Sequence, residues 1–207
     1  MSRFSVAAVL FEGFEMLDLY GPLEMYAMHP EIFTITTIAE TMEPVQSSSG
    51  PCTLPEDVFA NAVLYDILLV PGGDGTRIQE ENAVLLDWLA TAGARACRIT
   101  SVCTGSGLLA RAGLLDGHAA TTNKRAFDEV ARLGPRTDWR RSARWVVSGN
   151  RVTSSGVSAG IDMTLAVIEV LAGARTAYNA ALWAEYTRQT DADKDPFAIR
   201  QEQDDDR

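Results

Sequence analysis

Residues 99–110 read ITSVCTGSGLLA, where a β-branched run gives way to glycine and leucine with Cys103 between them. The β-branched run predicts a strand, and the residues after the cysteine predict a helix. Ser101 and Gly105, two positions before and two after Cys103, are small, as a sharp strand-to-helix elbow requires, because larger side chains would collide there. Ligands of open α/β sheets bind beyond the carboxyl ends of strands, so this elbow is the first candidate site.

Two interpretations of Cys103 are open at this point. A thiol at a helix start faces unpaired N–H groups and the positive end of the helix dipole, which both favour the reactive thiolate. Free cysteine is also among the most buried residue types, which is our interpretation of Cys52 and Cys97.

The stretch GSGLLA at 105–110 also fits the pattern G-x-G-x-x-A of dinucleotide sites. The match is weak, because the acidic residue expected about 20 positions later should end a strand. Asp128 and Glu129 instead stand in a helical pattern, so we do not expect a dinucleotide cofactor.

Composition bounds the function further. The chain has 207 residues, of which 46% are hydrophobic, and a formal charge of −10, which opposes binding of nucleic acid. We find neither a signal-peptide cleavage site nor an apolar run of about 18 residues, and we expect a cytoplasmic protein without a membrane partner. Three cysteines without a CxxC pair and two histidines argue against a disulfide framework and a metal site.

Short apolar runs alternate with helical patterns, which is typical of buried parallel strands joined by crossover helices. Strands are predicted at Phe4–Phe11, Ile32–Ala39, Ile67–Val70, Arg98–Val102 and His118–Thr121, with a β-hairpin at Arg144–Val147 and Arg151–Ser154. Helices are predicted at Gly21–Met28, Asn82–Gly93, Gly105–Ala112, Lys124–Leu133, Gly160–Leu171 and Thr176–Thr190. Residues 45–57 predict a loop with a short hairpin. We expect one domain over residues 1–190 and a polar acidic tail over 191–207, with Pro196–Phe197 docked on the body.

Several stretches together resemble the ThiJ/PfpI superfamily of class I glutamine amidotransferase-like proteins. They are LDLYGPLEMY, YDILLVPGGDGTR, ITSVCTGSGLLARAGLLDGHAATTN and RVTSSGVSAGIDMTLAVIEVLAG, and they occur in the order of that family. Within the superfamily, an Asp in LDLYGP paired with Cys-Thr-Gly-Ser resembles the isonitrile hydratases. The same pairing resembles the sensor-like domain of AraC-type regulators.

The resemblance implies a flavodoxin-like three-layer α/β sandwich that forms a homodimer. It implies that Cys103 is the nucleophile, that Asp18 is the acid that meets its sulfur, and that Thr104 belongs to the catalytic group. Backbone N–H groups of Gly72, Gly73 and Thr104 would act as oxyanion-type donors. The substrate-binding residues that we expect are Gly72, Gly73, Ser155 and Gly156.

These residues also have structural interpretations. Asp18 precedes the predicted helix at Gly21 and could be its N-cap, and Thr104 could belong to a helix N-terminus or hydrogen-bond Asp18. Hydrolytic relatives place a histidine where this chain has Thr104, and neither His29 nor His118 is placed as a base, which disfavours a Cys–His dyad.

The resemblance therefore implies hydration of an isonitrile to an N-substituted formamide, with one carboxyl group as acid and then base and with no cofactor. Some hydratases have a histidine after the paired threonines, where this chain has Asn123, so the substrate is open. The alternatives are a non-catalytic domain that binds a small molecule or senses oxidants through Cys103, and a glyoxalase-like or deglycase-like activity. The expected partners are a small-molecule substrate and a second copy of the chain.

Overall fold

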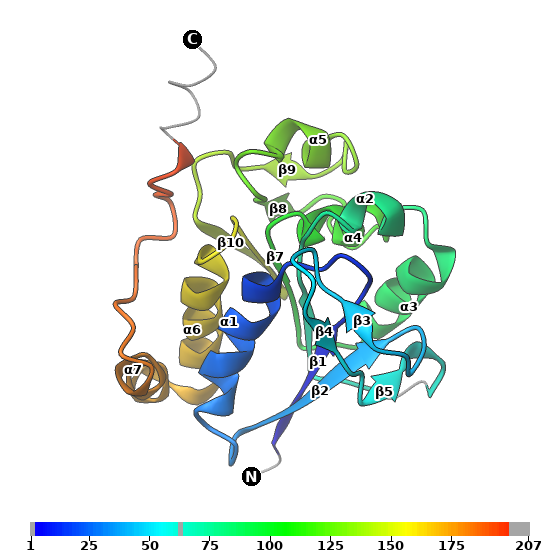
Figure 1. Cartoon of the computed structure of the whole chain (residues 1–207). Coiled ribbons are helices and arrows are strands. Elements are labelled where there is room, and N and C mark those ends of the chain that lie inside the picture. Colours follow the sequence, from blue (N-terminus) through cyan, green and yellow to red (C-terminus); the bar gives the residue numbers. More distant parts are fainter. Residues whose placement is uncertain (1–2, 62–63, 199–207) are drawn as a thin grey trace.

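A seven-stranded sheet forms the centre of the computed structural model, which describes residues 3–61 and 64–198 (Figure 1). The strand order is β10-β11-β7-β6-β1-β2-β5. All neighbours are parallel except the β10–β11 hairpin. The strands are β1 (Phe4–Val9), β2 (Phe33–Ala39), β5 (Asp57–Val58), β6 (Ile67–Val70), β7 (Arg98–Val102), β10 (Trp145–Ser148) and β11 (Arg151–Ser154). The strands predicted from short apolar runs are therefore confirmed for this sheet, and β6 and most of β1 and β7 are buried, as expected of central parallel strands.

Helices cover both faces of the sheet, and this arrangement confirms the expected three-layer α/β sandwich (Figure 1). One face carries α1 (Met16–Ala27), α6 (Ala159–Ala172) and α7 (Ala174–Trp183), and the other carries α3 (Ala83–Gly93) and α4 (Gly105–Arg111) with the short α2 (Thr76–Gln79). Asn82 caps α3 as predicted, since its side chain accepts hydrogen bonds from the N–H groups of Val84 and Leu85.

Short elements fill the connections. β3 (Val45–Gln46) and β4 (Cys52–Thr53) form the small antiparallel pair expected in residues 45–57. A 3-10 turn follows β5 at Phe59–Asn61. β8 (Ala119–Ala120) pairs with β9 (Asp138–Trp139), and α5 (Phe127–Ala131) lies between them in sequence. The strand predicted at His118–Thr121 thus belongs to a separate two-stranded pair and not to the central sheet.

Helix α1 begins at Met16, five residues before the predicted start at Gly21, so the prediction from Gly21–Pro22 was wrong. Gly21 serves packing instead, because a Cβ at this position would lie 2.9 Å from Cγ1 of Ile161 in α6. Asp18 consequently lies inside the first turn of α1, and its N-cap interpretation is excluded.

Two helices are shorter than predicted. The helix predicted at Lys124–Leu133 is the five-residue α5, because residues 124–126 form a turn around the Asn123 side chain. The helix predicted at Thr176–Thr190 ends at Trp183, and Glu185 nearby adopts a positive φ of 50°, which a helix cannot contain.

The described part of the tail, residues 191–198, is docked on the body. The carbonyl oxygen of Ala192 accepts hydrogen bonds from the N–H groups of Arg144 and Trp145, and Asp195 and Ala198 are buried. Docking therefore depends on Asp195 and Ala198, whereas Pro196 and Phe197, which we expected to dock, are exposed. The rest of the predicted tail, residues 199–207, lies outside the described residues.

Candidate active site

Four loops meet at one edge of the sheet because they follow four adjacent parallel strands, β1, β6, β7 and β11. The loop after β1 leads to Asp18, and the turn after β6 carries Gly72 and Gly73. The elbow after β7 carries Cys103 and Thr104, and the loop after β11 carries Ser155 and Gly156. The topology thus brings all the predicted site residues to the carboxyl edge of the sheet, where ligands of α/β sheets bind.

Cys103 has a positive φ of 57°, a conformation that non-glycine residues adopt rarely. Hydrogen bonds hold this strained residue on both sides. Its N–H donates to the carbonyl oxygens of Ser154 and Ser155, and its carbonyl oxygen accepts from the hydroxyls of Ser106 and Thr122. Backbone strain of this kind gathers at functional sites, and here it turns the chain sharply between β7 and α4.

Asp18 is fully buried, and no cation pairs with it among the described residues. Its Oδ2 accepts a hydrogen bond from the N–H of Gly72 at 3.0 Å. Its Oδ1 is buried and accepts no hydrogen bond of ordinary geometry from a described residue, and the carboxyl group interacts with the Cys103 thiol. A buried carboxyl oxygen without a donor is uncommon unless the group has a chemical role.

Burial raises the pKa of the Asp18 carboxyl group to about 8, the Gly72 N–H opposes this shift, and the charge of Glu15 adds to it. Burial also raises the pKa of the Cys103 thiol above its ordinary value, and the charge of Asp18 raises it further. The N–H of Thr104 and the side-chain amide of Asn123 lower it. Asp18 can therefore hold a proton near neutral pH beside the sulfur, which an exposed carboxyl group cannot do.

The glycine turn and Thr104 are connected differently from what we expected. The N–H of Gly72 donates to Asp18, and the N–H of Gly73 donates to Oγ1 of Thr104 at 3.1 Å, so neither is free for an oxyanion. The Thr104 hydroxyl also accepts from the hydroxyl of Thr76, and it makes no hydrogen bond with Asp18. Thr104 and Gly73 thus tie the β6 turn to the elbow, and the N–H of Thr104 faces the sulfur.

Ser155 and Gly156 follow β11, whereas Asp18 follows β1. Ser155 is fully buried, and its hydroxyl has no hydrogen-bond partner among the described residues. A Cβ at position 156 would lie 2.9 Å from the sulfur of Cys103 and 2.3 Å from Nδ2 of Asn123. Glycine at 156 therefore allows the loop to close against the sulfur.

Asn123 contacts the sulfur directly and is absent from the sequence-predicted site. Its Nδ2 donates to Sγ of Cys103 at 3.1 Å. Asn123 lies in a loop outside the central sheet. The expectation that ligands bind at the carboxyl ends of the central strands therefore does not predict it. The available signal was its position at the end of the stretch ATTN, after Thr122, whose hydroxyl holds the elbow.

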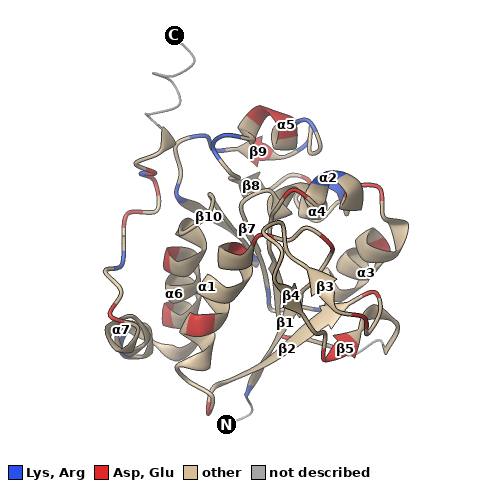
Figure 2. Ribbon diagram, viewed as in Figure 1, with Lys and Arg blue, Asp and Glu red and all other residues tan. Residues whose placement is uncertain are grey.

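A cavity of about 430 Å³ opens onto Cys103, Thr104 and Asn123. Its rim is charged, with Arg77 of α2 paired to Asp74 at 3.1 Å and to Glu129 of α5 at 2.7 Å. Figure 2 shows acidic and basic residues interspersed around α2 and α5, so the charges around the mouth are mixed in sign. Cys103 itself is only 6% exposed, so the sulfur is accessible from this mouth to slender groups alone.

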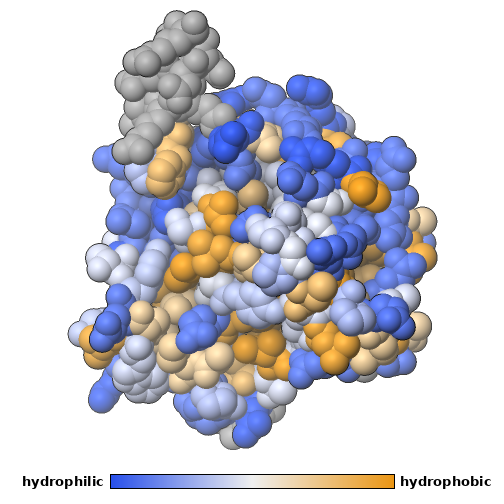
Figure 3. Space-filling model, in the orientation of Figure 1, coloured by the Kyte–Doolittle hydropathy of each residue, from blue (hydrophilic) through white to orange (hydrophobic). Residues whose placement is uncertain are grey.

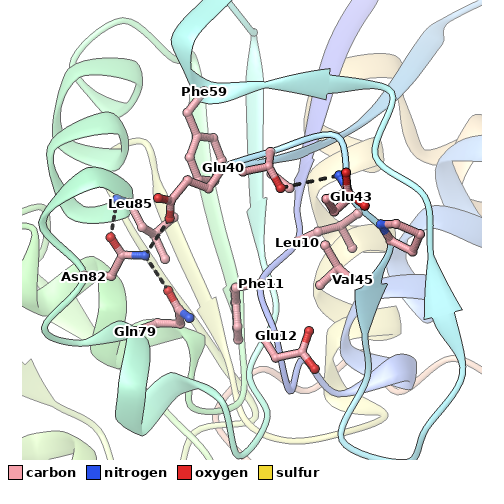
Figure 4. A pocket seen from close by; sticks show the side chains of 13 residues that line it. Leu10, Phe11, Glu12, Glu40, Glu43, Val45, Phe59, Gln79, Asn82 and Leu85 are labelled. Atoms are coloured by element: carbon pink, nitrogen blue, oxygen red, sulfur yellow. Dashed lines mark hydrogen bonds between the residues drawn. The ribbon is translucent and has the colours of Figure 1, made fainter.

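A second cavity, of about 270 Å³, lies near the ends of β1 and β2 and contains none of the predicted site residues (Figure 4). Its base is apolar, with Leu10, Phe11 and Phe59, and Glu12, Glu40 and Glu43 line it with carboxylates. Across residues 3–61 and 64–198, no three His, Cys, Asp or Glu side chains gather as metal ligands. Within the same residues, no helix is long and apolar enough to cross a membrane.

The chain is similar to known proteins in sequence and in structure. Residues 4–170 match the DJ-1/PfpI family. The chain is 36% identical over 183 residues to the isonitrile hydratase of Pseudomonas putida, covering 87% of this chain and 78% of that protein. It is 30% identical over 171 residues to the HTH-type transcriptional regulator GbdR of Pseudomonas aeruginosa, covering 79% of this chain and 46% of the regulator. A solved ThiJ/PfpI family protein from Pseudomonas syringae is 32% identical, with a TM-score of 0.83 over 98% of this chain and 85% of that one.

Proposed function

The chain belongs to the DJ-1/PfpI family, and within it we propose that this protein hydrates isonitriles to N-substituted formamides through a covalent adduct on Cys103. The observation that carries the proposal is the buried pair of Asp18 and Cys103, in which the carboxyl group can act as an acid near neutral pH. The similarity to the isonitrile hydratase of Pseudomonas putida supports the choice of substrate class.

The first step forms a carbon–sulfur bond. The Cys103 thiolate attacks the terminal carbon of R–N≡C, and that carbon takes the proton of the neutral Asp18 carboxyl group. The product is a thioimidate, R–N=CH–S–Cys103, beside an ionised Asp18. Burial supports this step, because it keeps the carboxyl group protonated near neutral pH, so that a proton is available beside the forming C–H bond.

The second step consumes water. Ionised Asp18 takes a proton from water as the hydroxide adds to the thioimidate carbon, and Asp18 passes that proton to the nitrogen. The adduct R–NH–CH(OH)–S–Cys103 then expels the thiolate as its hydroxyl proton returns to Asp18. The formamide R–NH–CHO leaves, and both groups regain their starting states. One carboxyl group serves as acid and as base, so the scheme needs no histidine.

The positions of the two histidines agree with that scheme. His29 bonds the carbonyl oxygen of Thr176 and packs against Trp183, and His118 bonds the Ser148 hydroxyl. Neither lines the cavity at Cys103. A Cys–His hydrolase dyad would require a histidine within hydrogen-bond reach of the sulfur.

The test is conversion of a simple alkyl isonitrile to its formamide, followed by mass spectrometry. We expect turnover by the wild type and none by Cys103→Ala. The matched control is Cys97→Ala, which removes a thiol outside the site and should retain the wild-type rate. A wild-type protein that forms no formamide, or a Cys103→Ala variant that still forms it, would overturn the proposal.

Similarity to GbdR favours a second candidate, a non-catalytic domain that binds a small molecule or senses oxidants at Cys103. In the sensing case, mild peroxide adds oxygen to the Cys103 sulfur, which increases the intact mass, and Cys103→Ala abolishes the increase. This candidate ranks second because the similarity to GbdR is weaker, at 30% identity, than the 36% identity to the isonitrile hydratase. Lactate release from methylglyoxal would instead indicate the glyoxalase-like alternative.

We also propose that the protein forms a homodimer through exposed apolar residues of its helices. Leu17 of α1 is 43% exposed, and Tyr178, Leu182 and Trp183 of α7 are more than half exposed. Figure 3 shows hydrophobic residues grouped on the face that carries α1. Sedimentation should report a dimer for the wild type and a shift toward monomer for Leu17→Glu or Leu182→Glu.

A further inference from the structure

The side-chain amide of Asn123 is fixed in one orientation. Its Oδ1 accepts hydrogen bonds from the N–H of Arg125 at 2.9 Å and from the N–H of Ala126 at 3.2 Å. Because only the oxygen can accept those two bonds, the NH₂ end faces Sγ of Cys103, at 3.1 Å. A rotation of the amide would lose all three interactions.

The loop that carries Asn123 is fastened on both sides. The Thr122 hydroxyl donates to the carbonyl oxygen of Cys103 at 2.9 Å. Lys124 is buried, and its Nζ donates to the Thr121 hydroxyl at 2.9 Å and to the carbonyl oxygen of Ala143 at 2.6 Å. A buried lysine is costly unless it is fully bonded, so this anchor serves to hold the loop in place.

The sulfur needs such a donor because its other surroundings oppose ionisation. Burial and the Asp18 charge both raise the pKa of the Cys103 thiol, and the groups that lower it are the N–H of Thr104 and the amide of Asn123. Among the described residues, Asn123 thus supplies the side-chain hydrogen bond that favours the thiolate.

We propose that Asn123 is a catalytic residue that stabilises the Cys103 thiolate by its Nδ2–H bond, when the sulfur attacks and again when it leaves. The inference rests on the proposed function only for the identity of the electrophile. A donor to the sulfur lowers the energy of the free thiolate in both the first and the last step, whichever substrate carbon it attacks. The contact is direct, so no substrate is required to complete it.

Two substitutions of Asn123 separate this role from its structural one. Asn123→Ser retains a side-chain oxygen that can accept from the N–H groups of Arg125 and Ala126, yet the shorter side chain places no donor at the sulfur. Asn123→Asp retains both the shape and the acceptor but places a carboxylate oxygen at Sγ, where its charge opposes the thiolate. The matched control is Asn150→Asp, because Asn150 lies in the β10–β11 turn, outside the site, and donates to the carbonyl oxygen of Ala96.

The experiment measures alkylation of Cys103 by iodoacetamide as a function of pH, in a background of Cys52→Ser and Cys97→Ser, which leaves one thiol. A hydrogen bond to a charged group corresponds to a change of about tenfold or more in an ionisation equilibrium. We therefore expect alkylation near neutral pH to be about tenfold slower in Asn123→Ser, slower still in Asn123→Asp, and unchanged in Asn150→Asp. Circular dichroism confirms that each variant is folded.

A merely structural role of Asn123 predicts another order, with Asn123→Asp close to wild type because it conserves the shape. That order, or folded variants that all titrate like wild type, would overturn the inference. The outcome is independent of the isonitrile assay. If the wild type forms no formamide while the alkylation order holds, the proposed substrate is wrong and the role of Asn123 stands.

Discussion

The carboxyl group of Asp18 and the thiol of Cys103 lie together at the carboxyl edge of the sheet, and among the described residues no cation balances either of them. Asp18 comes from the helix after β1, and Cys103 comes from the elbow after β7, with β6 between those strands. The charge of Asp18 therefore raises the pKa of the Cys103 thiol beyond the effect of burial. The arrangement is unfavourable for two anions, so ionisation of either group opposes ionisation of the other.

Substitution Asp18→Asn should separate formation of the nucleophile from proton transfer. Removal of the carboxylate lowers the pKa of the Cys103 thiol, so alkylation by iodoacetamide near neutral pH becomes faster than in wild type. Isonitrile hydration should fall by about 100-fold or more, because no acid remains for the thioimidate step. Hydration at the wild-type rate in Asp18→Asn would exclude Asp18 as the proton donor.

The same carboxyl group should make stability depend on pH. Its pKa is about 8 when folded and near 3.8 otherwise, so between those values the folded protein binds a proton that the unfolded chain has lost. The free energy of unfolding therefore falls as pH rises across this window, by on the order of 5 kcal/mol for an isolated group. In Asp18→Asn, the side-chain amide oxygen can still accept the hydrogen bond from the N–H of Gly72. The amide carries no charge, so its burial has no cost that depends on pH.

Denaturant titrations of wild type and Asp18→Asn at about pH 5 and about pH 8 measure this effect. We expect Asp18→Asn to be the more stable protein at the higher pH, with a difference that shrinks as pH falls. A difference that is the same at both values would mean that Asp18 titrates normally in the folded protein. Such a gain in stability on loss of activity is expected of a site under electrostatic strain.

Gly156→Ala tests how closely the loop after β11 approaches the sulfur. The added Cβ would lie 2.3 Å from Nδ2 of Asn123 and 2.9 Å from Sγ of Cys103, so one of these groups must move. Hydration should fall at least about tenfold, since small displacements of reacting groups are costly. Gly107→Ala in α4 is the control, because the Cβ there meets only flexible ends of Leu133 and Val130 at 3.0 Å or more and should leave activity unchanged.

Much of the fold could be predicted from the sequence because the buried parallel strands are short runs of β-branched and aliphatic residues. The strands at Ile67–Val70 and Arg98–Val102 have the predicted bounds. Cys103 was found because it stands after such a strand, at the edge of the sheet where ligands bind. Asp18 was found through the resemblance of LDLYGPLEMY to the ThiJ/PfpI superfamily. The beginning of α1 was misplaced because a glycine and a proline usually mark a helix start, whereas Gly21 serves contact with α6.

The contacts of the site could not be predicted in the same way. Asn123 and Asp195 act from irregular segments, whose positions depend on side-chain anchors and not on hydrophobic periodicity. The turn at Gly72 and Gly73 follows its strand as expected, yet its N–H groups donate to Asp18 and Thr104 and are not free for a ligand. Periodicity thus identifies which loops meet, and the hydrogen bonds between them depend on tertiary packing.

The docked tail should support the site through Asp195. This carboxyl group is buried, with Nζ of Lys124 at 4.0 Å and a guanidinium nitrogen of Arg144 at 3.9 Å, while Arg144 also pairs with Asp162 at 2.6 Å. Burial lowers the pKa of Lys124 to about 8, and the charge of Asp195 opposes that shift. Without Asp195, the lysine that anchors the Asn123 loop loses its nearest counter-charge.

Asp195→Asn should therefore destabilise the protein by about 3 kcal/mol, which is typical when one partner of a buried ion pair is removed. Hydration should fall as well, because Lys124 no longer holds the loop that places Asn123 at the sulfur. Asp193→Asn is the matched control, since Asp193 is exposed in the same segment and should change neither quantity. If Lys124→Met combined with Asp195→Asn restores part of the lost stability, the two charges are coupled as the geometry indicates, whereas strictly additive losses would contradict the coupling.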